Sequence, residues 1–480
     1  MEKTNDKKVL IKIDNLRQYF NVKSSGFRAK KRYVRANDGI SIEILEGETF
    51  GLVGESGCGK STLGRSLLQL YEQTGGRTIY YGKKIEEVNP NYIHRYIKDF
   101  GKERSRLKTL EKEMLEKEKA IEIIDVNDRE ARQEAHDEYN IIDNDYNNTY
   151  KTLVGIAGAL FLEEDEEKVS KLLSNEYKAK LELFNAEKAG KNTDSEKRNL
   201  QLAQDEILKA KEKFATHEDF ELLESGLEDG IDLTLLDTEE MRHLRKELQL
   251  IFQDPYSSLN PKMTVGQIIS EGLFAHGMFN KRDDELQEYV IDTMEACGLA
   301  SYFLHRYPHQ FSGGQRQRIG IARSVALKPD FIVCDEAVSA LDVSIQSQII
   351  NLLLNLKQKE NLTYMFISHD LSVIKYISDR VGVMYLGSMV ELANTENLYA
   401  RPMHPYTEAL LSAIPTTDEE RGEVIIMEGD IPSPINPPLG CKFHTRCRYA
   451  TDICKIQIPQ LEEVEPGHFV ACHHKLNEVK

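Results

Sequence analysis

A segment near the start of the chain has the residue types and spacing that bind the phosphates of a nucleotide. It fits the pattern G-x-x-x-x-G-K-[ST] and consists of Gly54, Glu55, Ser56, Gly57, Cys58, Gly59, Lys60, Ser61 and Thr62. Glycines let backbone N–H groups close around phosphate oxygens, because a Cβ would obstruct that approach. Lys60 can reach the β- and γ-phosphates, and the Ser61 hydroxyl can ligate Mg²⁺. An apolar run before the segment and leucines at helical spacing after it complete a strand–loop–helix pattern, which predicts binding of a nucleoside triphosphate.

Two later apolar runs end in side chains that could act on a bound nucleotide. Phe331–Cys334 is followed by Asp335 and Glu336, and a similar run from Tyr364 is followed by His369. An acid at the end of a buried strand beside a phosphate loop can hold Mg²⁺, and a neighbouring carboxylate can orient and deprotonate an attacking water. Each run alone is typical of an ordinary strand end, so the inference depends on their order along one chain.

Composition and charge narrow the class of protein. The chain has 480 residues and a net charge of −17, which argues against a nucleic-acid binder. Its first ten residues are polar and charged, unlike a signal peptide, and its longest apolar run, Leu153–Leu162, is too short to span a bilayer. We therefore expect a soluble cytoplasmic chain whose link to the membrane runs through partners.

The character of the sequence changes between Glu86 and Gly230. This segment holds 36 acidic and 23 basic residues and no cysteine. Apolar residues recur at heptad-like spacing from Leu107 to Ile124 and again from Leu200 to Phe214, which predicts a helical or coiled-coil insertion, folded as antiparallel arms. A disordered acidic loop is the alternative.

The order of the motifs resembles that of ATP-binding cassette (ABC) ATPases. After the phosphate loop come Gln253, the signature Phe311–Gln315, the run Val333–Glu336, Ser339–Asp342 and His369. The resemblance implies an α/β fold: a RecA-like P-loop core with an antiparallel β subdomain and a helical subdomain at about 255–325. It also implies that two cassettes enclose two ATP molecules head to tail.

The resemblance also implies a role for each matching residue. Lys60 becomes the phosphate clamp, Ser61, Gln253 and Asp335 the Mg²⁺ shell, Glu336 the catalytic base and His369 the contact to the γ-phosphate. Tyr19 or Phe20 would stack on adenine. The dimer contacts would be Asp342 at the seam and a signature that binds the partner's ATP, namely Ser312, Gly313, Gly314 and Gln315. Ala337 and Phe311 depart from the usual proline and leucine, but neither change removes a reacting group.

A closer resemblance is to the F-type ATP-binding subunit of oligopeptide and dipeptide importers. It is carried by Gln253–Pro261, Phe311–Arg318, Ser378–Leu386 and His404–Thr407. It implies a D-type partner cassette, two membrane permeases, an external peptide-binding protein and a peripheral location on the cytoplasmic face of the membrane. The insertion departs from this family and could contact an additional protein. An importer of another solute such as a metal chelate is an alternative, and a coiled-coil ABC ATPase of DNA maintenance or a non-hydrolysing cassette is a more distant one.

Four of the seven cysteines lie close together near the end of the chain: Cys441, Cys447, Cys454 and Cys472. Four thiolates suit an Fe–S cluster or zinc. The resemblance favours a [4Fe–4S] cluster, because the C-terminal domain of such importer subunits can carry one. Zinc and free thiols stay as alternatives.

These features divide the chain into four predicted parts. They are the first part of the ATPase domain at 1–85, the acidic insertion at 86–230, the second part of the ATPase domain at 231–400, and a C-terminal oligopeptide-transporter-type domain at 401–480.

Overall fold

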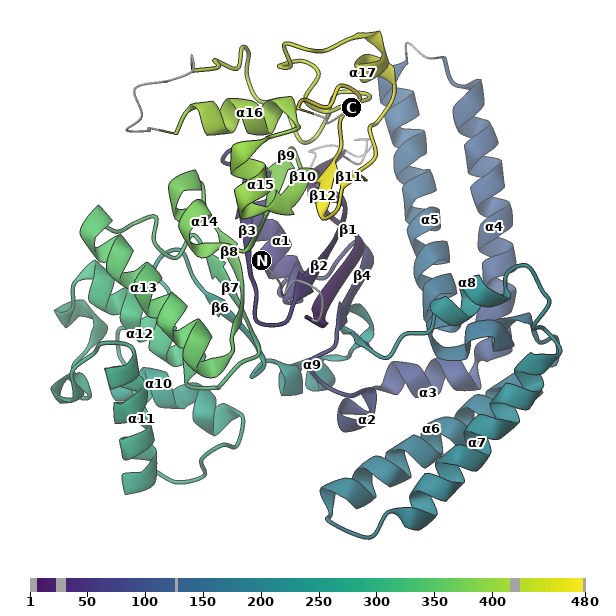
Figure 1. Ribbon diagram of the computed structural model, residues 1–480, viewed down its shortest axis with the longest axis horizontal. Helices are drawn as coiled ribbons and strands as arrows, with labels where there is room; N and C mark the ends of the chain where they lie inside the picture. The colour runs from purple at the N-terminus through teal and green to yellow at the C-terminus, as the bar shows by residue number, and fades with distance from the viewer. Residues whose placement is uncertain (1–6, 23–31, 126–127, 415–423, 478–480) are drawn as a thin grey trace, which may run out of the picture. The chain divides into compact units, whose positions relative to one another are not determined.

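The computed structural model describes residues 7–22, 32–125, 128–414 and 424–477 (Figure 1). The chain forms two compact units. One contains Met1–Leu10, Leu16–Thr74 and Arg242–Lys480, and the other contains Ile11–Asn15 and Gly75–Met241.

An eight-stranded sheet organises the first unit, with strand order β11-β12-β10-β9-β3-β8-β7-β6. Five adjacent strands pair in parallel, and the remaining three pair antiparallel at one side. The parallel strands are β6 (Leu248–Ile251), β7 (Phe331–Asp335), β8 (Thr363–Ile367), β3 (Thr49–Val53) and β9 (Arg380–Tyr385). The antiparallel strands are β10 (Ser388–Asn394), β12 (His468–Val470) and β11 (Glu462–Glu465). Strands β3, β7 and β8 are buried along their whole length, as expected of a sheet covered on both faces.

The register brings the carboxyl ends of the central parallel strands to one edge of the sheet. Leu52 of β3 and Asp335 of β7 both pair with Ile367 of β8, and Ile251 of β6 pairs with Cys334. The residues that follow these strands therefore meet at this edge, where open α/β sheets bind their ligands.

The first unit contains a set of helices, most of which contribute side chains to one apolar core. They are α1 (Lys60–Leu67), α10 (Val265–Ala275), α11 (Asp284–Ala296), α12 (Gly313–Val325), α13 (Val343–Glu360), α14 (Leu371–Ile377), α15 (Thr395–Ala400), α16 (Pro405–Ser412) and α17 (Asp452–Ile456). Short 3₁₀ turns precede the signature at Ser301–Phe303 and Pro308–Gln310. Between β6 and β7, α10 to α12 form the helical part predicted at about 255–325.

A second sheet has the order β2-β1-β4-β5. Its strands are β1 (Val9–Val22), β2 (Arg32–Leu45), β4 (Gly75–Tyr80) and β5 (Ile231–Asp232), and residues of β1 belong to both units. Strands β4 and β5 pair antiparallel, with Tyr80 opposite Ile231. The long segment between them thus leaves and returns at adjacent points of one sheet.

Two helix pairs dominate the second unit (Figure 1): α4 with α5 and α6 with α7. Its helices are α2 (Ile85–Val88), α3 (Asn91–Lys98), α4 (Phe100–Ile123), α5 (Arg129–Ala157), α6 (Glu166–Lys188), α7 (Asp194–Glu212) and α8 (Phe220–Ser225), with 3₁₀ helices η1 (Gly158–Leu162) and η2 (Leu233–Leu235), and α9 (Thr238–Leu244) leads out of it. The described residues of the segment Glu86–Gly230 are therefore largely helical, and the alternative of a disordered acidic loop does not describe them.

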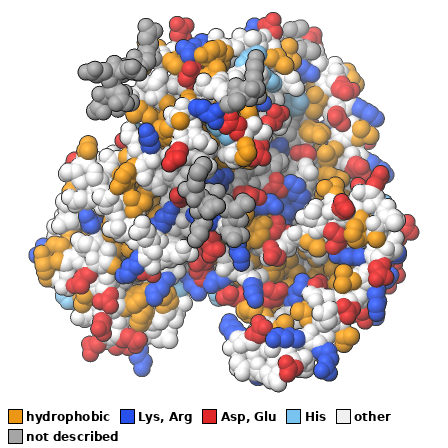
Figure 2. Space-filling view, viewed as in Figure 1, with side chains coloured by type: hydrophobic (Ala, Val, Ile, Leu, Met, Phe, Trp, Pro, Cys, Tyr) orange, Lys and Arg blue, Asp and Glu red, His pale blue; other side chains and the backbone are white. Residues whose placement is uncertain are grey.

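Only the first part of helix α4 contributes to the apolar core of the second unit. Of the heptad-like positions on α4, Leu107 and Leu110 are buried, whereas Met114 and Ile121 are half-exposed. The core instead joins α3, the end of α5, α6 and α7. On the face shown in Figure 2, acidic and basic side chains are interspersed rather than gathered by sign.

Candidate nucleotide-binding and hydrolysis site

The phosphate-loop segment joins β3 to α1 at the carboxyl edge of the sheet. Gly59 has φ +103° and Gly54 has φ +150°, values that residues with a side chain rarely adopt. A Cβ on Gly59 would overlap the carbonyl oxygen of Ala36, and a Cβ on Gly54 that of Met384. The glycines in this motif are therefore required by close backbone approach on two sides of the loop.

Lys60 lies inside the loop that precedes it. It is 5% exposed, and its Nζ donates hydrogen bonds to the carbonyl oxygens of Gly54 at 2.7 Å and Glu55 at 3.0 Å. A buried ammonium group needs such partners, because an unpaired charge is expensive to remove from water. The amine thus sits in the concavity formed by the loop backbone, where a phosphate oxygen would meet it.

Ser61 and Asp335 form a pair of oxygen donors beside the loop. The Ser61 hydroxyl donates to Oδ1 of Asp335 at 2.5 Å, and Arg65 donates to Oδ2 at 3.1 Å. The Asp335 side chain is 1% exposed, and these two contacts supply the partners that a buried carboxylate needs. A hydroxyl and a carboxylate are hard oxygen ligands of the kind that Mg²⁺ prefers, so the donor set fits this ion.

The carboxylate of Glu336 contacts two other predicted site residues, Gln253 and His369. Its Oε2 accepts a hydrogen bond from Nε2 of Gln253 at 2.8 Å and lies 3.4 Å from Nδ1 of His369. The residue has φ +48°, a left-handed conformation of the kind that is costly for a residue with a side chain and that clusters at functional sites. Gln253 is thus placed against the carboxylate of Glu336, whereas the sequence grouped it with Ser61 and Asp335.

The two aromatic candidates for adenine stacking lie in different surroundings. The hydroxyl of Tyr19 donates to Asp38 at 2.5 Å, and burial raises the pKa of Tyr19 above its ordinary value. Phe20 is 36% exposed and contacts Tyr71 edge to face, with ring centroids 5.5 Å apart. Phe20 therefore has the more accessible ring.

The signature begins helix α12, and two of its residues, Ser312 and Gly313, face solvent. Ser312 is the N-cap: its hydroxyl accepts from the N–H of Gln315 at 3.4 Å, and the Gln315 side chain accepts from the N–H of Ser312 at 3.1 Å. Ser312 and Gly313 are exposed, while Gly314 is buried against Ile345. The positive end of a helix at an exposed position suits an anion held by another molecule.

Asp342 caps a helix, and Phe311 and Ala337, the two residues that depart from the usual motif, are buried. Asp342 is exposed and caps α13 by accepting from the N–H of Ile345 at 3.0 Å. Phe311 is 4% exposed and packs edge to face on Phe303, and Ala337 is 2% exposed. Both departures from the usual motif therefore fall in the apolar core rather than among the reacting groups.

The structure adds residues that the sequence did not single out. Arg65 bonds Asp335, and Tyr406 and Arg446 bond Glu55 of the phosphate loop. Arg65 lies one helical turn after Ser61, so its position was a usable signal. Arg446 is separated from Glu55 by 391 positions, and its spacing carries no signal.

The four clustered cysteines line one small cavity of about 10 Å³, which has room for about one water. The N–H of Cys441 bonds the carbonyl of Cys454 at 2.8 Å. Burial raises the pKa of Cys441 to about 11 and that of Cys472 to about 12, so these thiols stay protonated at neutral pH in these surroundings. Within the described ranges, no group of three or more His, Cys, Asp or Glu side chains has an arrangement that could hold a metal ion. The donor types suit a metal, but the present positions do not form a ligand shell.

Comparison with known sequences settles the family. The sequence pattern of the ABC transporter family matches residues 37–210 and 222–339. The chain belongs to the ABC transporter family. A second pattern, that of the oligopeptide/dipeptide transporter C-terminal region, matches residues 390–454. The family and the α/β fold class predicted from the motifs are thus confirmed, and this ABC protein is an ATP-hydrolysing enzyme that uses ATP and Mg²⁺.

Individual relatives align over nearly the whole chain. The oligopeptide transport ATP-binding protein AppF of Bacillus subtilis is 36% identical over 472 residues, which cover 98% of each chain. The putative oligopeptide transport ATP-binding protein YkfD of the same organism is 37% identical over 467 residues, which cover 97% of this chain and 95% of YkfD. A putative peptide import ATP-binding protein of Brucella ovis is 57% identical over 245 residues, which cover 51% of this chain and 77% of that relative. The Brucella protein is much shorter than this ABC ATPase, because the same 245 residues make up 77% of the Brucella protein and only 51% of this chain.

Among the described residues, no helix combines the length and the apolar character needed to cross a bilayer.

The position of Glu336 generates a first prediction. Glu336→Gln keeps the size of the side chain but removes the carboxylate that would accept a proton from water, so we expect kcat for ATP hydrolysis to fall by about 10²- to 10⁴-fold. ATP binding should persist, because Lys60, Ser61 and Asp335 are unchanged. The measurement is steady-state phosphate release together with nucleotide retention. Glu360→Gln, at the exposed end of α13, is the matched control and should keep normal turnover; normal turnover in Glu336→Gln would reject its role as base.

Proposed function

We propose that this ATPase powers the import of oligopeptides or dipeptides through a membrane transporter. The observation that carries the proposal is the match of residues 390–454 to the oligopeptide/dipeptide transporter C-terminal region. The names of the full-length relatives support it. In this proposal the chain is a peripheral subunit on the cytoplasmic face of the membrane. Its partners are a D-type cassette, two permeases and an external peptide-binding protein.

Within that complex we assign the following roles. Lys60 neutralises the β- and γ-phosphates, and Ser61 and Asp335 hold Mg²⁺, which neutralises phosphate charge when bound. Glu336 takes the proton of the attacking water, while Gln253 and His369 hold that carboxylate and the water in line with the γ-phosphate. The exposed signature contacts the nucleotide of the partner cassette, Asp342 lies at the seam between cassettes, and Phe20 stacks on adenine.

The test of this proposal is substrate-stimulated hydrolysis. We expect the ATPase rate of the complete complex in lipid vesicles to rise several-fold when a peptide-loaded binding protein is added. A binding protein without peptide should raise the ATPase rate less, because it brings no substrate to the transporter. Stimulation by a metal chelate, without stimulation by peptides, would favour the alternative importer instead. The acidic net charge and the position of the insertion before Gln253 disfavour a role on DNA.

We also propose that the cysteines Cys441, Cys447, Cys454 and Cys472 bind a [4Fe–4S] cluster, with zinc as the alternative. Their convergence on one cavity and their thiol chemistry support a metal site. Because the present cavity has room for about one water, the site would open when a metal binds, and its thiols would lose their protons as thiolate ligands do.

Anaerobic purification of the full chain tests this assignment. About four iron atoms and four sulfides per chain, lost in Cys447→Ser, are expected for the cluster. Cys297→Ser, at a buried thiol of the helical subdomain, is the control and should keep the metal. One zinc per chain without iron would select the alternative, and neither metal would reject both.

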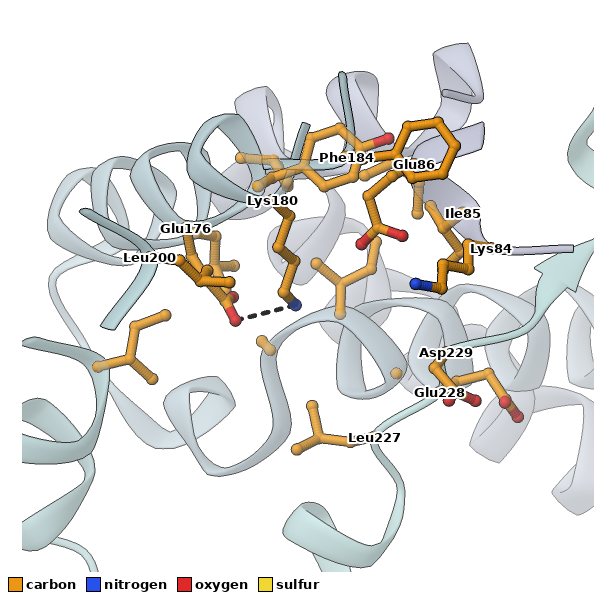
Figure 3. A pocket seen from close by; sticks show the side chains of 18 of the residues that line it. Lys84, Ile85, Glu86, Glu176, Lys180, Phe184, Leu200, Leu227, Glu228 and Asp229 are labelled. Atoms are coloured by element: carbon orange, nitrogen blue, oxygen red, sulfur yellow. Dashed lines mark ion pairs between the residues drawn. The ribbon is translucent and has the colours of Figure 1, made fainter. Parts of the chain in front are cut away.

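We further propose that residues 86–230 form a separate interaction module within a cassette made of 1–85 and 231–400, followed by a C-terminal domain at 401–480. A cavity of about 770 Å³ in the helical unit supports this role (Figure 3). Its wall is largely apolar, with Ile93 and Leu173 among the side chains that line it. A cavity of this size accommodates a ligand or a segment of another protein.

The charges around this cavity indicate the chemistry of the partner. Lys180 pairs with Glu176 at 2.9 Å, as Figure 3 shows, and Lys211 pairs with Glu224 at 2.7 Å. Three lining carboxylates make no ion pair with the described residues: Glu86, Glu187 and Asp229. Lys84 is a lining cation, but acidic side chains outnumber basic ones around the cavity. We therefore propose a partner segment with apolar side chains and at least one cationic group.

The pairing of β4 with β5 shows where the helical segment can be deleted without separating these two strands. Because Tyr80 lies opposite Ile231, residues 81–230 can be replaced by Asn-Gly, which closes a two-residue hairpin. We expect nucleotide affinity within about twofold of the full chain, since Lys60, Asp335 and Glu336 lie outside the deletion. A soluble variant that has lost nucleotide binding would reject the division into cassette and module.

A further inference from the structure

Two side chains of the C-terminal region contact the phosphate loop directly. Arg446 donates to both carboxylate oxygens of Glu55, from Nη1 to Oε2 at 2.7 Å and from Nη2 to Oε1 at 3.0 Å. The backbone N–H of Glu55 donates to the hydroxyl of Tyr406 at 2.8 Å. A two-pronged arginine–carboxylate pair fixes orientation as well as distance, which a lysine could not do.

These contacts are shielded from water. The side chain of Arg446 is 7% exposed and that of Glu55 is 20% exposed. Tyr406 is fully buried, and its ring lies 4.8 Å from that of Tyr385 and 5.3 Å from that of Phe443. Salt therefore screens the pair only weakly, and the tyrosine that supports it is held in a packed aromatic cluster.

The position of Glu55 makes this contact relevant to the nucleotide. Its carbonyl oxygen and that of Gly54 are the two carbonyl acceptors of the Lys60 amine, which also contacts the Cys58 sulfur. Holding Glu55 from its side chain and from its N–H therefore constrains the path of the loop backbone that holds Lys60. A loop fixed before the nucleotide arrives loses less conformational freedom on binding.

We propose that Arg446 is a positioning residue for ATP: through Glu55, and with Tyr406, it holds the phosphate loop in its binding conformation. The C-terminal region thereby contributes to nucleotide affinity although it supplies no group to the phosphates. The proposal rests on the assignment of this loop as the nucleotide site.

The affinity of the full chain for a fluorescent ATP analogue, N-methylanthraniloyl-ATP with Mg²⁺, tests the proposal without any partner subunit. We expect Arg446→Gln to weaken binding about tenfold, because two charge-assisted hydrogen bonds to Glu55 are lost. Arg448→Gln is the matched control: it lies two positions on, pairs with Glu408 at 3.0 Å, and should leave affinity unchanged. The chain contains no tryptophan, so the analogue can be followed with little background.

Further variants separate positioning from general stability. Glu55→Gln should weaken binding to the same degree, and adding Arg446→Gln to it should cause little further loss, because both remove one interaction. The charge exchange Glu55→Arg with Arg446→Glu should regain part of the affinity. A purely structural role would instead lower the thermal midpoint and leave affinity at 25 °C unchanged. If Arg446→Gln does not fold, Glu55→Gln and Tyr406→Phe provide the same comparison.

Lys60→Ala distinguishes the two levels of the proposal. If Lys60→Ala abolishes binding while Arg446→Gln and Glu55→Gln bind normally, the positioning role is rejected and the nucleotide site stands. If Lys60→Ala binds as the unchanged chain does, the assignment of the site itself fails. Loss of affinity in Lys60→Ala, Arg446→Gln and Glu55→Gln, with a normal Arg448→Gln, supports both.

Discussion

The pairing of four parallel strands is the constraint on which the active arrangement depends. Strands β3, β8, β7 and β6 are adjacent and in register, so the residues that follow them emerge at one edge. The phosphate loop follows β3, Glu336 follows β7, His369 follows β8 and Gln253 follows β6. A slip of one residue in any of these pairings would turn every side chain of that strand to the other face of the sheet. The distances of 2.5 Å between Ser61 and Asp335 and 2.8 Å between Gln253 and Glu336 are consequences of this register.

Close backbone contacts then restrict the loop in a way that side chains alone could not. Gly54 and Gly59 approach the carbonyl groups of Met384 and Ala36, which belong to strands β9 and β2. Glu336 accepts a left-handed conformation, and its N–H bonds the carbonyl of Ile367 at 3.0 Å, which ties the end of β7 to the end of β8. Conformations of this cost persist only where the surrounding structure over-determines them. The sheet thus holds the backbone of the phosphate loop and of Glu336 in fixed positions.

The C-terminal region is continuous with this framework. Strands β11 and β12 extend the same sheet beyond β10, and Phe443 packs with Tyr385 of β9 in the aromatic cluster that supports Tyr406. The buried pair of His468 with Glu391, at 2.7 Å, fastens β12 to β10. Residues 390–454, which match the oligopeptide/dipeptide transporter C-terminal region, therefore contribute to the core of the ATPase unit.

Residue types and spacing by themselves predicted the α/β fold class and the order of the motifs along the chain, and the resemblance of that order identified the family that the comparison confirms. These follow from local rules: glycines where phosphates approach, carboxylates at strand ends, and a helix after the loop. The sequence also anticipated that the four cysteines would share a location.

Tertiary structure decided the contacts between segments far apart along the chain. It placed Gln253 against Glu336, used the hydroxyl of Tyr19 in a bond to Asp38, and joined Arg446 to Glu55. It brought the four cysteines to one cavity without the geometry of a ligand shell, and it buried only the first part of the apolar pattern on α4. Such contacts depend on strand register and side-chain packing, because local sequence sets which groups are present but not which distant groups share a buried space.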